Sequence, residues 1–152
     1  MATILQFQQK LRKIADEKYL EQLALEQLKK FENDLVKLNK ERLSGGEDLD
    51  GNILGVYKKS TQEFARTSEP SPRQDKIAGT NYNFEWTGGL FDGMYLRVNN
   101  DYLQLFSKDQ KTPLLITKYK DLFGLQPEQL AKLVRETVYP EIMKQIRLKL
   151  EI

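Results

Sequence analysis

The stretch that decides the fold class is NYNFEWTGGLFDGMYLRVNN, residues 81–100. Its first third alternates aromatic with polar side chains, the aromatic ones being Tyr82, Phe84 and Trp86. A period of two is typical of a β-strand that buries one face. The run Thr87-Gly88-Gly89 then predicts a turn of the backbone.

The second half of this stretch predicts more β structure. Apolar residues alternate again, at Met94, Leu96 and Val98. Residues 99–101 (Asn-Asn-Asp) are typical of a turn, and Leu103 and Leu105 continue into a returning strand. The sequence therefore predicts a small antiparallel β meander over residues 81–110.

Upstream, residues 3–43 predict a helical arm. They contain no Gly or Pro and are rich in strong helix formers. Apolar residues recur at spacings of three and four, at Ile4, Phe7, Leu11 and Ile14 and again at Leu28, Phe31, Leu35 and Leu38. The pattern shifts around residues 18–25, so we expect either one long helix with a stutter or two helices.

The length of this arm predicts an interface. One helix of about 40 residues extends about 60 Å, which exceeds what a compact domain of this size needs. Excess helix length is usually buried against a partner. We therefore expect subunit contacts at Phe7, Leu11, Ile14 and Leu25.

Residues 44–80 predict irregular structure. The run from Ser44 to Asn52 is dense in turn formers. Residues 53–57 favour either a short strand or an anchored turn. Residues 67–75 offer no packing side chains, so we expect a mobile loop there.

Residues 114–151 predict a second helical zone. Residues 114–123 favour a short helix or an extended packing segment, closed at Gly124. Pro127 suits the first turn of a helix, whose apolar face is Leu130, Leu133, Val134, Thr137, Val138, Ile142, Ile146 and Leu150. Pro140 should kink this helix or interrupt it.

The expected fold is thus α+β in a single domain, residues 1–152. It consists of a long N-terminal helix or helical pair, a small antiparallel β meander and a kinked C-terminal helix. Tyr57, Trp86, Leu90, Phe91 and Phe123 are expected to anchor it.

Composition excludes several classes of function. The chain of 152 residues has no cysteine and no histidine. This rules out thiolate nucleophiles, histidine acid–base catalysis and the common zinc sites. We expect no enzyme and no cofactor.

Charge and hydropathy narrow the partners. The net charge of +2 supplies no strong attraction to nucleic acid or to an anionic membrane. The N-terminus lacks the pattern of a signal peptide, and no run approaches about 18 apolar residues. We expect a protein made and kept in the cytoplasm, or packed into a particle assembled there.

Three motifs favour backbone turns or exposed surface over chemistry. The acidic run of residues 47–52 spaces its oxygens like a calcium loop, yet Ile53 and Lys59 occupy the positions that need Gly and Glu. Residues 87–89 lack the Gly-Lys-Ser/Thr ending of a phosphate cradle. Glu85 belongs on the strand face opposite Phe84 and Trp86.

One cluster supports an alternative function. The basic residues Lys58, Lys59, Arg66 and Arg73 lie near Tyr57 and Phe64 in the sequence. Basic residues interleaved with aromatic ones contact single-stranded nucleic acid in many proteins. A nucleic-acid-associated accessory protein is therefore the alternative interpretation.

The order of the motifs resembles that of a known class of proteins. An N-terminal helix leads to LDGNILGVY (residues 49–57) and Ser60-Thr61, followed by a loop with Pro and Ser. NYNFEWTGGLF (residues 81–91) precedes a strand pair, and YKDLFGL (residues 119–125) leads into the last helix. Over residues 48–150 the chain resembles small virion-morphogenesis proteins of tailed phages and prophages, of the neck or tail-completion kind, especially those of Bacteroides-type hosts.

The resemblance implies a structural role without catalysis. A subunit of this kind would form a homo-oligomeric ring at the head–tail junction and contact portal, neck or tail proteins. It would be assembled in the host cytoplasm and reside in the virion. Head-to-tail contacts between identical subunits would close such a ring.

Overall fold

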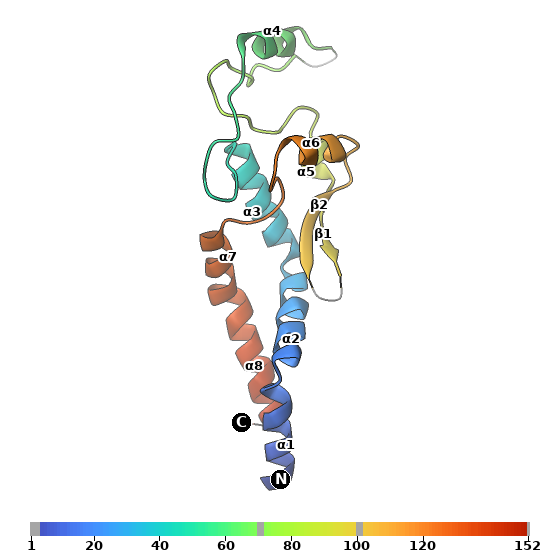
Figure 1. The fold of residues 1–152 in the computed structure, drawn as a ribbon, viewed down its shortest axis with the longest axis vertical. Coiled ribbons are helices and arrows are strands. Elements are labelled where there is room, and N and C mark those ends of the chain that lie inside the picture. Colours follow the sequence, from blue (N-terminus) through green and yellow to red (C-terminus); the bar gives the residue numbers. More distant parts are fainter. Residues whose placement is uncertain (1–3, 70–71, 100–101, 152) are drawn as a thin grey trace. The chain divides into compact units, whose positions relative to one another are not determined.

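The computed structural model describes residues 4–69, 72–99 and 102–151. The chain is α+β, as predicted, with helices at both ends and a two-stranded antiparallel sheet (Figure 1). The elements run in the order α1 (Ile4–Ile14), α2 (Glu17–Lys30), α3 (Glu32–Ser44), α4 (Lys59–Thr67), α5 (Gly89–Asp92), β1 (Met94–Val98), β2 (Leu103–Ser107), α6 (Thr112–Lys118), α7 (Pro127–Leu133), the π-helix η1 (Val134–Val138) and α8 (Tyr139–Leu150).

These elements form two compact units. Unit 1 is Met1–Glu32, Val98–Leu103 and Glu128–Ile152, and unit 2 is Asn33–Arg97 and Gln104–Pro127. Neither unit is one continuous segment. Whether the whole chain folds as the expected single domain stays a prediction.

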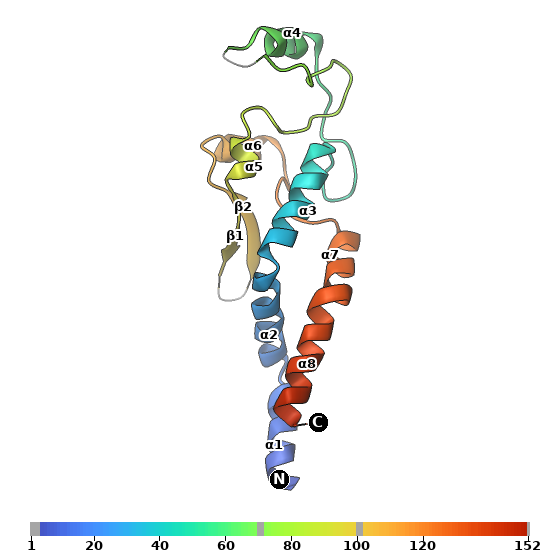
Figure 2. The same cartoon turned by 180° about the vertical axis from the view of Figure 1, so that it is seen from behind.

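In unit 1 the N-terminal helices pack against the C-terminal one. Both ribbon views show α8 running antiparallel to α2, with its last turns beside α1 (Figures 1 and 2). The Lys10 ammonium donates to the Glu151 carboxylate at 2.6 Å. The Lys149 ammonium donates to the Tyr19 hydroxyl at 2.7 Å and lies over its ring.

The helical arm forms as predicted, but two breaks divide it into three successive helices rather than one or two. The first break is at Asp16, whose carboxylate accepts the Lys18 N–H and caps α2. The second is at Phe31, whose N–H bonds the carbonyl of Leu28 at the end of α2. At Asp16 the side-chain cap satisfies a backbone donor at the start of α2, which favours a new helix over continuation of α1.

The C-terminal helix is interrupted where Pro140 predicts. Pro140 has no N–H, and its ring would clash with the carbonyl of Glu136 in a regular α-helix. The structure accommodates the ring with a π-helical turn, in which the Tyr139 N–H bonds the Val134 carbonyl.

In unit 2 the core lies between α3, α5 and the hairpin. Its buried members are Leu43, Leu90, Phe91, Met94 and Leu122. Of the expected anchors, Tyr57, Leu90 and Phe91 are buried, whereas Trp86 and Phe123 are half-buried.

A buried polar pair extends this core. The Asn39 side-chain oxygen accepts the Gly124 N–H at 2.9 Å and the Arg42 guanidinium at 3.1 Å. Arg42 also donates to the carbonyl of Leu122 at 2.6 Å. Burial lowers the pKa of Arg42, although nearby Asp48 and Glu47 oppose the shift. These bonds attach residues 122–124 to α3.

The sheet is smaller than predicted. The hairpin of β1 and β2 forms as expected. The prediction of a further strand over Tyr82, Phe84 and Trp86 is wrong, because these residues form no strand. Only Asn81 forms an isolated bridge, with Val56. Phe84 has φ 55°, a left-handed conformation that ends any extended run.

The described residues of 44–80 contain more regular structure than predicted. They contain helix α4, which the sequence analysis missed. Residues 53–57 form an anchored turn, held by single bridges at Ile53 and Val56. Within the expected mobile loop, residues 70–71 lie outside the described residues, and the Arg73 N–H bonds the carbonyl of Ala65.

Candidate functional sites

The predicted subunit-contact residues lie in unit 1 and differ in exposure. Along α1 the exposed fraction is 80% at Ile4, 36% at Phe7, 42% at Leu11 and 9% at Ile14. Ile14 is therefore the least accessible of the four predicted contacts. Leu25, on α2, is half-buried.

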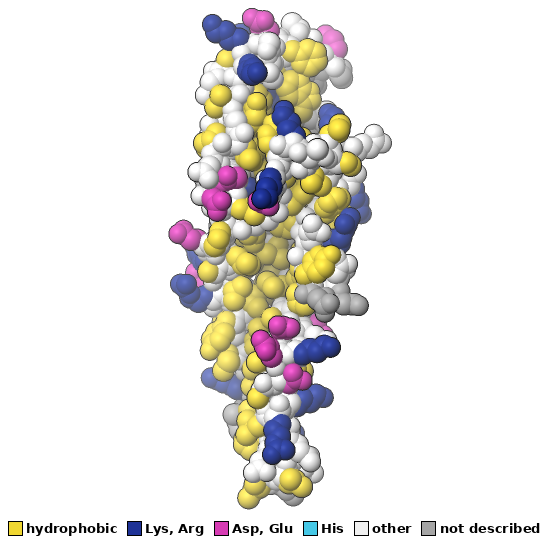
Figure 3. Space-filling model, viewed as in Figure 1, with side chains coloured by type: hydrophobic (Ala, Val, Ile, Leu, Met, Phe, Trp, Pro, Cys, Tyr) yellow, Lys and Arg dark blue, Asp and Glu magenta, His cyan; other side chains and the backbone are white. Residues whose placement is uncertain are grey.

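This exposure pattern has a simple structural cause. The apolar stripe of α1 is the same along its length, but α8 ends beside its C-terminal half (Figures 1 and 2). The stripe therefore changes from core to surface toward the N-terminus. In the space-filling view, hydrophobic side chains reach the surface over α1 with basic side chains next to them (Figure 3).

Charge on α1 has one sign. Its charged residues are Lys10, Arg12 and Lys13, with no acidic residue. Lys10 is paired with Glu151, whereas no ion pair joins Arg12 or Lys13 to any described residue. Helix α1 thus presents an apolar stripe that is exposed toward its N-terminus and two exposed cations in its last turn.

The basic cluster of the alternative interpretation is partly assembled. Lys59 and Arg66 lie seven residues apart on α4, which puts them on one face. Glu63 lies between them on that face and reduces its positive charge. Lys58 is exposed just before α4, and Arg73 is half-buried.

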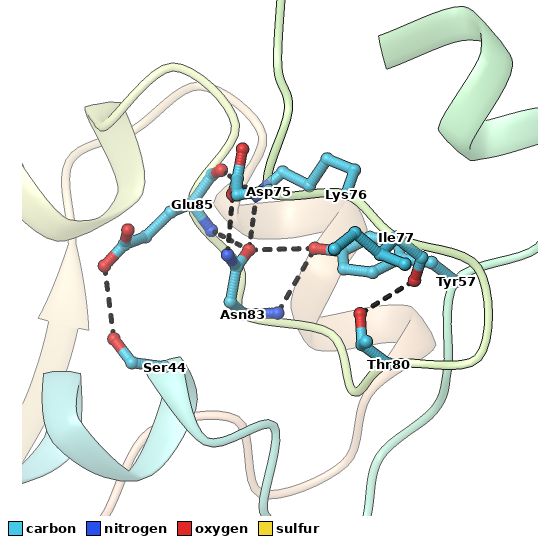
Figure 4. A network of polar contacts seen from close by, with 8 residues as sticks. All are labelled: Ser44, Tyr57, Asp75, Lys76, Ile77, Thr80, Asn83 and Glu85. Atoms are coloured by element: carbon cyan, nitrogen blue, oxygen red, sulfur yellow. Dashed lines mark hydrogen bonds and ion pairs between the residues drawn. The ribbon is translucent and has the colours of Figure 1, made fainter. Parts of the chain in front are cut away.

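Sequence reasoning missed a buried lysine in unit 2. Lys76 is 1% exposed. Its ammonium donates to the Asp75 carboxylate at 2.7 Å, to the Asn83 side-chain oxygen and to the carbonyl of Glu85 (Figure 4). It also lies 5.5 Å from the ring centroid of Tyr57 and 6.0 Å from that of Trp86. No sequence pattern marks this residue, because it stands in a polar run.

The same network fixes its neighbours. The Tyr57 hydroxyl donates to the Asn83 oxygen at 2.8 Å, and the Asn83 amide donates to Asp75 at 2.9 Å. Partial burial disfavours the Asp75 carboxylate, but its hydrogen bonds from Lys76 and Asn83 prevail and lower its pKa. A charged carboxylate therefore faces the buried ammonium at neutral pH.

A pocket of about 300 Å³ lies beside this network in unit 2. Aromatic side chains form much of its wall: Tyr57, Tyr82, Phe84, Trp86 and Tyr119. Tyr82 meets Tyr57 edge-on, with ring centroids 5.0 Å apart, and Phe84 meets Tyr119 in the same way at 5.2 Å.

Four charged residues also line the pocket. The two carboxylates have donors, since Glu85 accepts the Ser44 hydroxyl at 3.1 Å and Asp109 accepts the Lys111 N–H at 2.7 Å. The two ammonium groups, of Lys111 and Lys118, have no ion pair within the described residues. A hydrogen bond with the Tyr119 side chain raises the pKa of Lys118, which keeps it protonated.

The acidic run of residues 47–52 is a turn, as predicted. The Asp48 carboxylate accepts the N–H groups of Asp50 and Asn52 and the Asn52 amide. The backbone bond from Asn52 is the largest cause of the lowered pKa of Asp48. Among the described residues, no group of acidic side chains is arranged to hold a metal ion.

Comparisons with known proteins add no relative. No family model, curated protein or solved structure matches the chain. Within the described part of the chain, none of the helices has the length and apolar character needed to cross a membrane.

Proposed function

We propose that this protein is a non-enzymatic structural subunit of a tailed-phage virion, a neck, head–tail connector or tail-completion component that acts by protein–protein assembly. The phage assignment rests on the resemblance of residues 48–150. The mode of action rests on one observation, the apolar stripe of α1 that continues beyond the end of α8.

Burial of this stripe is energetically favourable. Exposed Ile, Leu and Phe side chains each gain about 1.5–3 kcal/mol when they are fully buried. Ile4, Phe7 and Leu11 are 80%, 36% and 42% exposed, so most of that gain remains available at Ile4 and roughly two-fifths of it at Phe7 and Leu11. A spacing of three and four residues is the pattern of a helix that lays one face into a groove.

Light scattering after size-exclusion chromatography tests the proposal over a series of concentrations. We expect the chain to grow from its 17.8 kDa mass toward a closed oligomer. The double variant Phe7→Asp/Leu11→Asp should stay monomeric with unchanged helical circular dichroism, because it places two charges on the stripe. Gln9→Asp adds a charge to the same helix away from the stripe and is the matched control.

Two results oppose the proposal. A mass that stays at that of one chain at every concentration would contradict self-assembly into a ring. Equal assembly of the double variant and the control would remove α1 as the contact.

The alternative, a nucleic-acid-associated accessory protein, is supported by Lys59 and Arg66 on one face of α4. Glu63 between them makes this support the weaker of the two. Binding of single-stranded DNA that weakens steeply with salt and is lost in Lys59→Glu/Arg66→Glu would favour it.

A further inference from the structure

We propose that the pocket of unit 2 binds a small organic anion with a flat apolar body, an aromatic carboxylate in chemical class. This site is separate from α1, and the proposal does not depend on the phage assignment. Four features of the pocket support it: its walls, their rigidity, its charges and its size.

The walls favour an apolar body. Five aromatic side chains and two leucines, Leu90 and Leu115, face the pocket. Apolar surface of this kind is the usual lining of small-molecule sites, with a few polar groups that orient the ligand. A flat ring fits between aromatic edges better than a flexible chain, since edge-to-face and offset contacts are the preferred geometries.

The walls are also fixed before any ligand arrives. Lys76 holds residues 83–85 through Asn83 and the carbonyl of Glu85, and Asn83 in turn holds the Tyr57 hydroxyl (Figure 4). Both Tyr57 and Trp86 lie within 6.0 Å of the Lys76 ammonium. Binding to such a preorganised site costs little ordering entropy.

The charges favour an anion. Of the four charged residues at the pocket, the carboxylates of Glu85 and Asp109 already accept hydrogen bonds. The ammonium groups of Lys111 and Lys118 remain without an ion pair among the described residues, and the Lys118 ammonium lies 5.1 Å from the ring centroid of Tyr119. A carboxylate on the ligand would accept charge-assisted hydrogen bonds from them.

The size limits the ligand. A volume of about 300 Å³ is at the lower end of the range of small-molecule pockets, about 300–1,000 Å³. That space suits one or two fused rings with a carboxylate.

The test uses 2-naphthoate as the probe and its neutral analogue 2-naphthamide as the chemical control. Calorimetry on the full chain measures both affinities. Trp86 is the only tryptophan, so its single indole N–H signal in a ¹H–¹⁵N spectrum reports directly on the pocket wall. We expect saturable binding of 2-naphthoate that shifts this signal, and at least tenfold weaker binding of 2-naphthamide.

Matched variants locate the anion. Lys111→Met/Lys118→Met keeps the aliphatic side chains and removes both ammonium groups, so naphthoate binding should weaken about tenfold or more. Lys120→Met, which removes an exposed ammonium outside the pocket, should bind as the unaltered chain does. Equal affinity for the amide, an unmoved Trp86 signal, or equal loss in Lys120→Met would each overturn the proposal.

Discussion

At the scale of single residues, the Lys76 ammonium organises unit 2 from inside. Its side chain is fully buried, whereas the side chain of its partner Asp75 is half-exposed. Three oxygens accept its donors, and two aromatic rings flank it. A buried ammonium is tolerated only when paired and hydrogen-bonded in this way.

Replacing it should therefore be costly. Lys76→Met removes the ammonium from the Asp75 carboxylate and the Glu85 carbonyl, and we expect the free energy of unfolding to fall by about 3 kcal/mol. That is the low end for a broken buried pair, because water can solvate the exposed side of Asp75. Urea unfolding followed by circular dichroism measures it.

Lys58→Met, an exposed lysine in the preceding segment, is the control and should change stability by less than about 0.5 kcal/mol. A Lys76→Met variant as stable as this control would contradict the role assigned to the buried ammonium.

Sequence reasoning could not find Lys76, and the reason is physical. Lysine is almost never fully buried, so a lysine beside Arg73, Gln74 and Asp75 indicates an exposed loop. Its burial depends on Asn83 and Glu85, whose proximity comes from the turn at Phe84. By contrast, burial of Leu90 and Phe91 followed from their apolar character alone.

At the scale of elements, helix α6 contains an unsatisfied hydroxyl. The Thr112 Oγ1 is buried and has no hydrogen-bond partner among the described residues. Thr117, on the same helix, is exposed and donates to the carbonyl of Pro113 at 2.9 Å. Replacement by valine would thus remove an unpaired hydroxyl at Thr112 and a hydrogen-bonded hydroxyl at Thr117.

We expect Thr112→Val to raise the free energy of unfolding by about 1 kcal/mol, because it replaces a buried unpaired polar group by a methyl of the same shape. Thr117→Val should give no gain, since it removes a hydrogen bond at the surface. Thermal and urea unfolding of both variants check this difference. Destabilisation by Thr112→Val would show that the hydroxyl has a partner in solution.

Helices and strands were predictable where the spacing of apolar residues was not overridden by a local backbone conformation. The hairpin of β1 and β2 and the start of the last helix at Pro127 followed from alternation and from proline chemistry. The strand over 82–86 failed because Phe84 adopts a left-handed conformation, for which its side chain gives no warning. Helix α4 was missed because residues 59–67 are short and polar between turn-forming runs.

The candidate sites were predictable to different degrees. The exposed stripe at Phe7 and Leu11 was visible in the sequence, although burial of Ile14 depends on where α8 ends. The pocket was not visible. Its wall comes from Tyr57, residues 82–86 and Tyr119, which only the tertiary fold brings together.

At the scale of the whole molecule, the two units are joined in a way that favours cooperative unfolding. Unit 1 consists of three chain segments and unit 2 of two, so no single linker separates them. When either unit folds, it fixes the positions at which the chain enters and leaves the other unit.

We therefore expect one coincident unfolding transition. Trp86 fluorescence reports on unit 2, and circular dichroism at 222 nm reports largely on the long helices of unit 1. Coincident midpoints in urea would support the expectation of a single domain, whereas separated midpoints would mean that the units unfold independently.

The π-helical turn at Val134–Val138 has a consequence for chain length. It holds one residue more than the α-helical turn it replaces. In a regular α-helix, one added residue would rotate the side chains that follow by about 100°. Within this turn the wider spacing keeps Val134 and Val138, four residues apart, on one face of the helix. We therefore expect a variant that lacks one residue of this turn and carries Pro140→Ala to form a continuous α-helix and to present α8 in the same orientation.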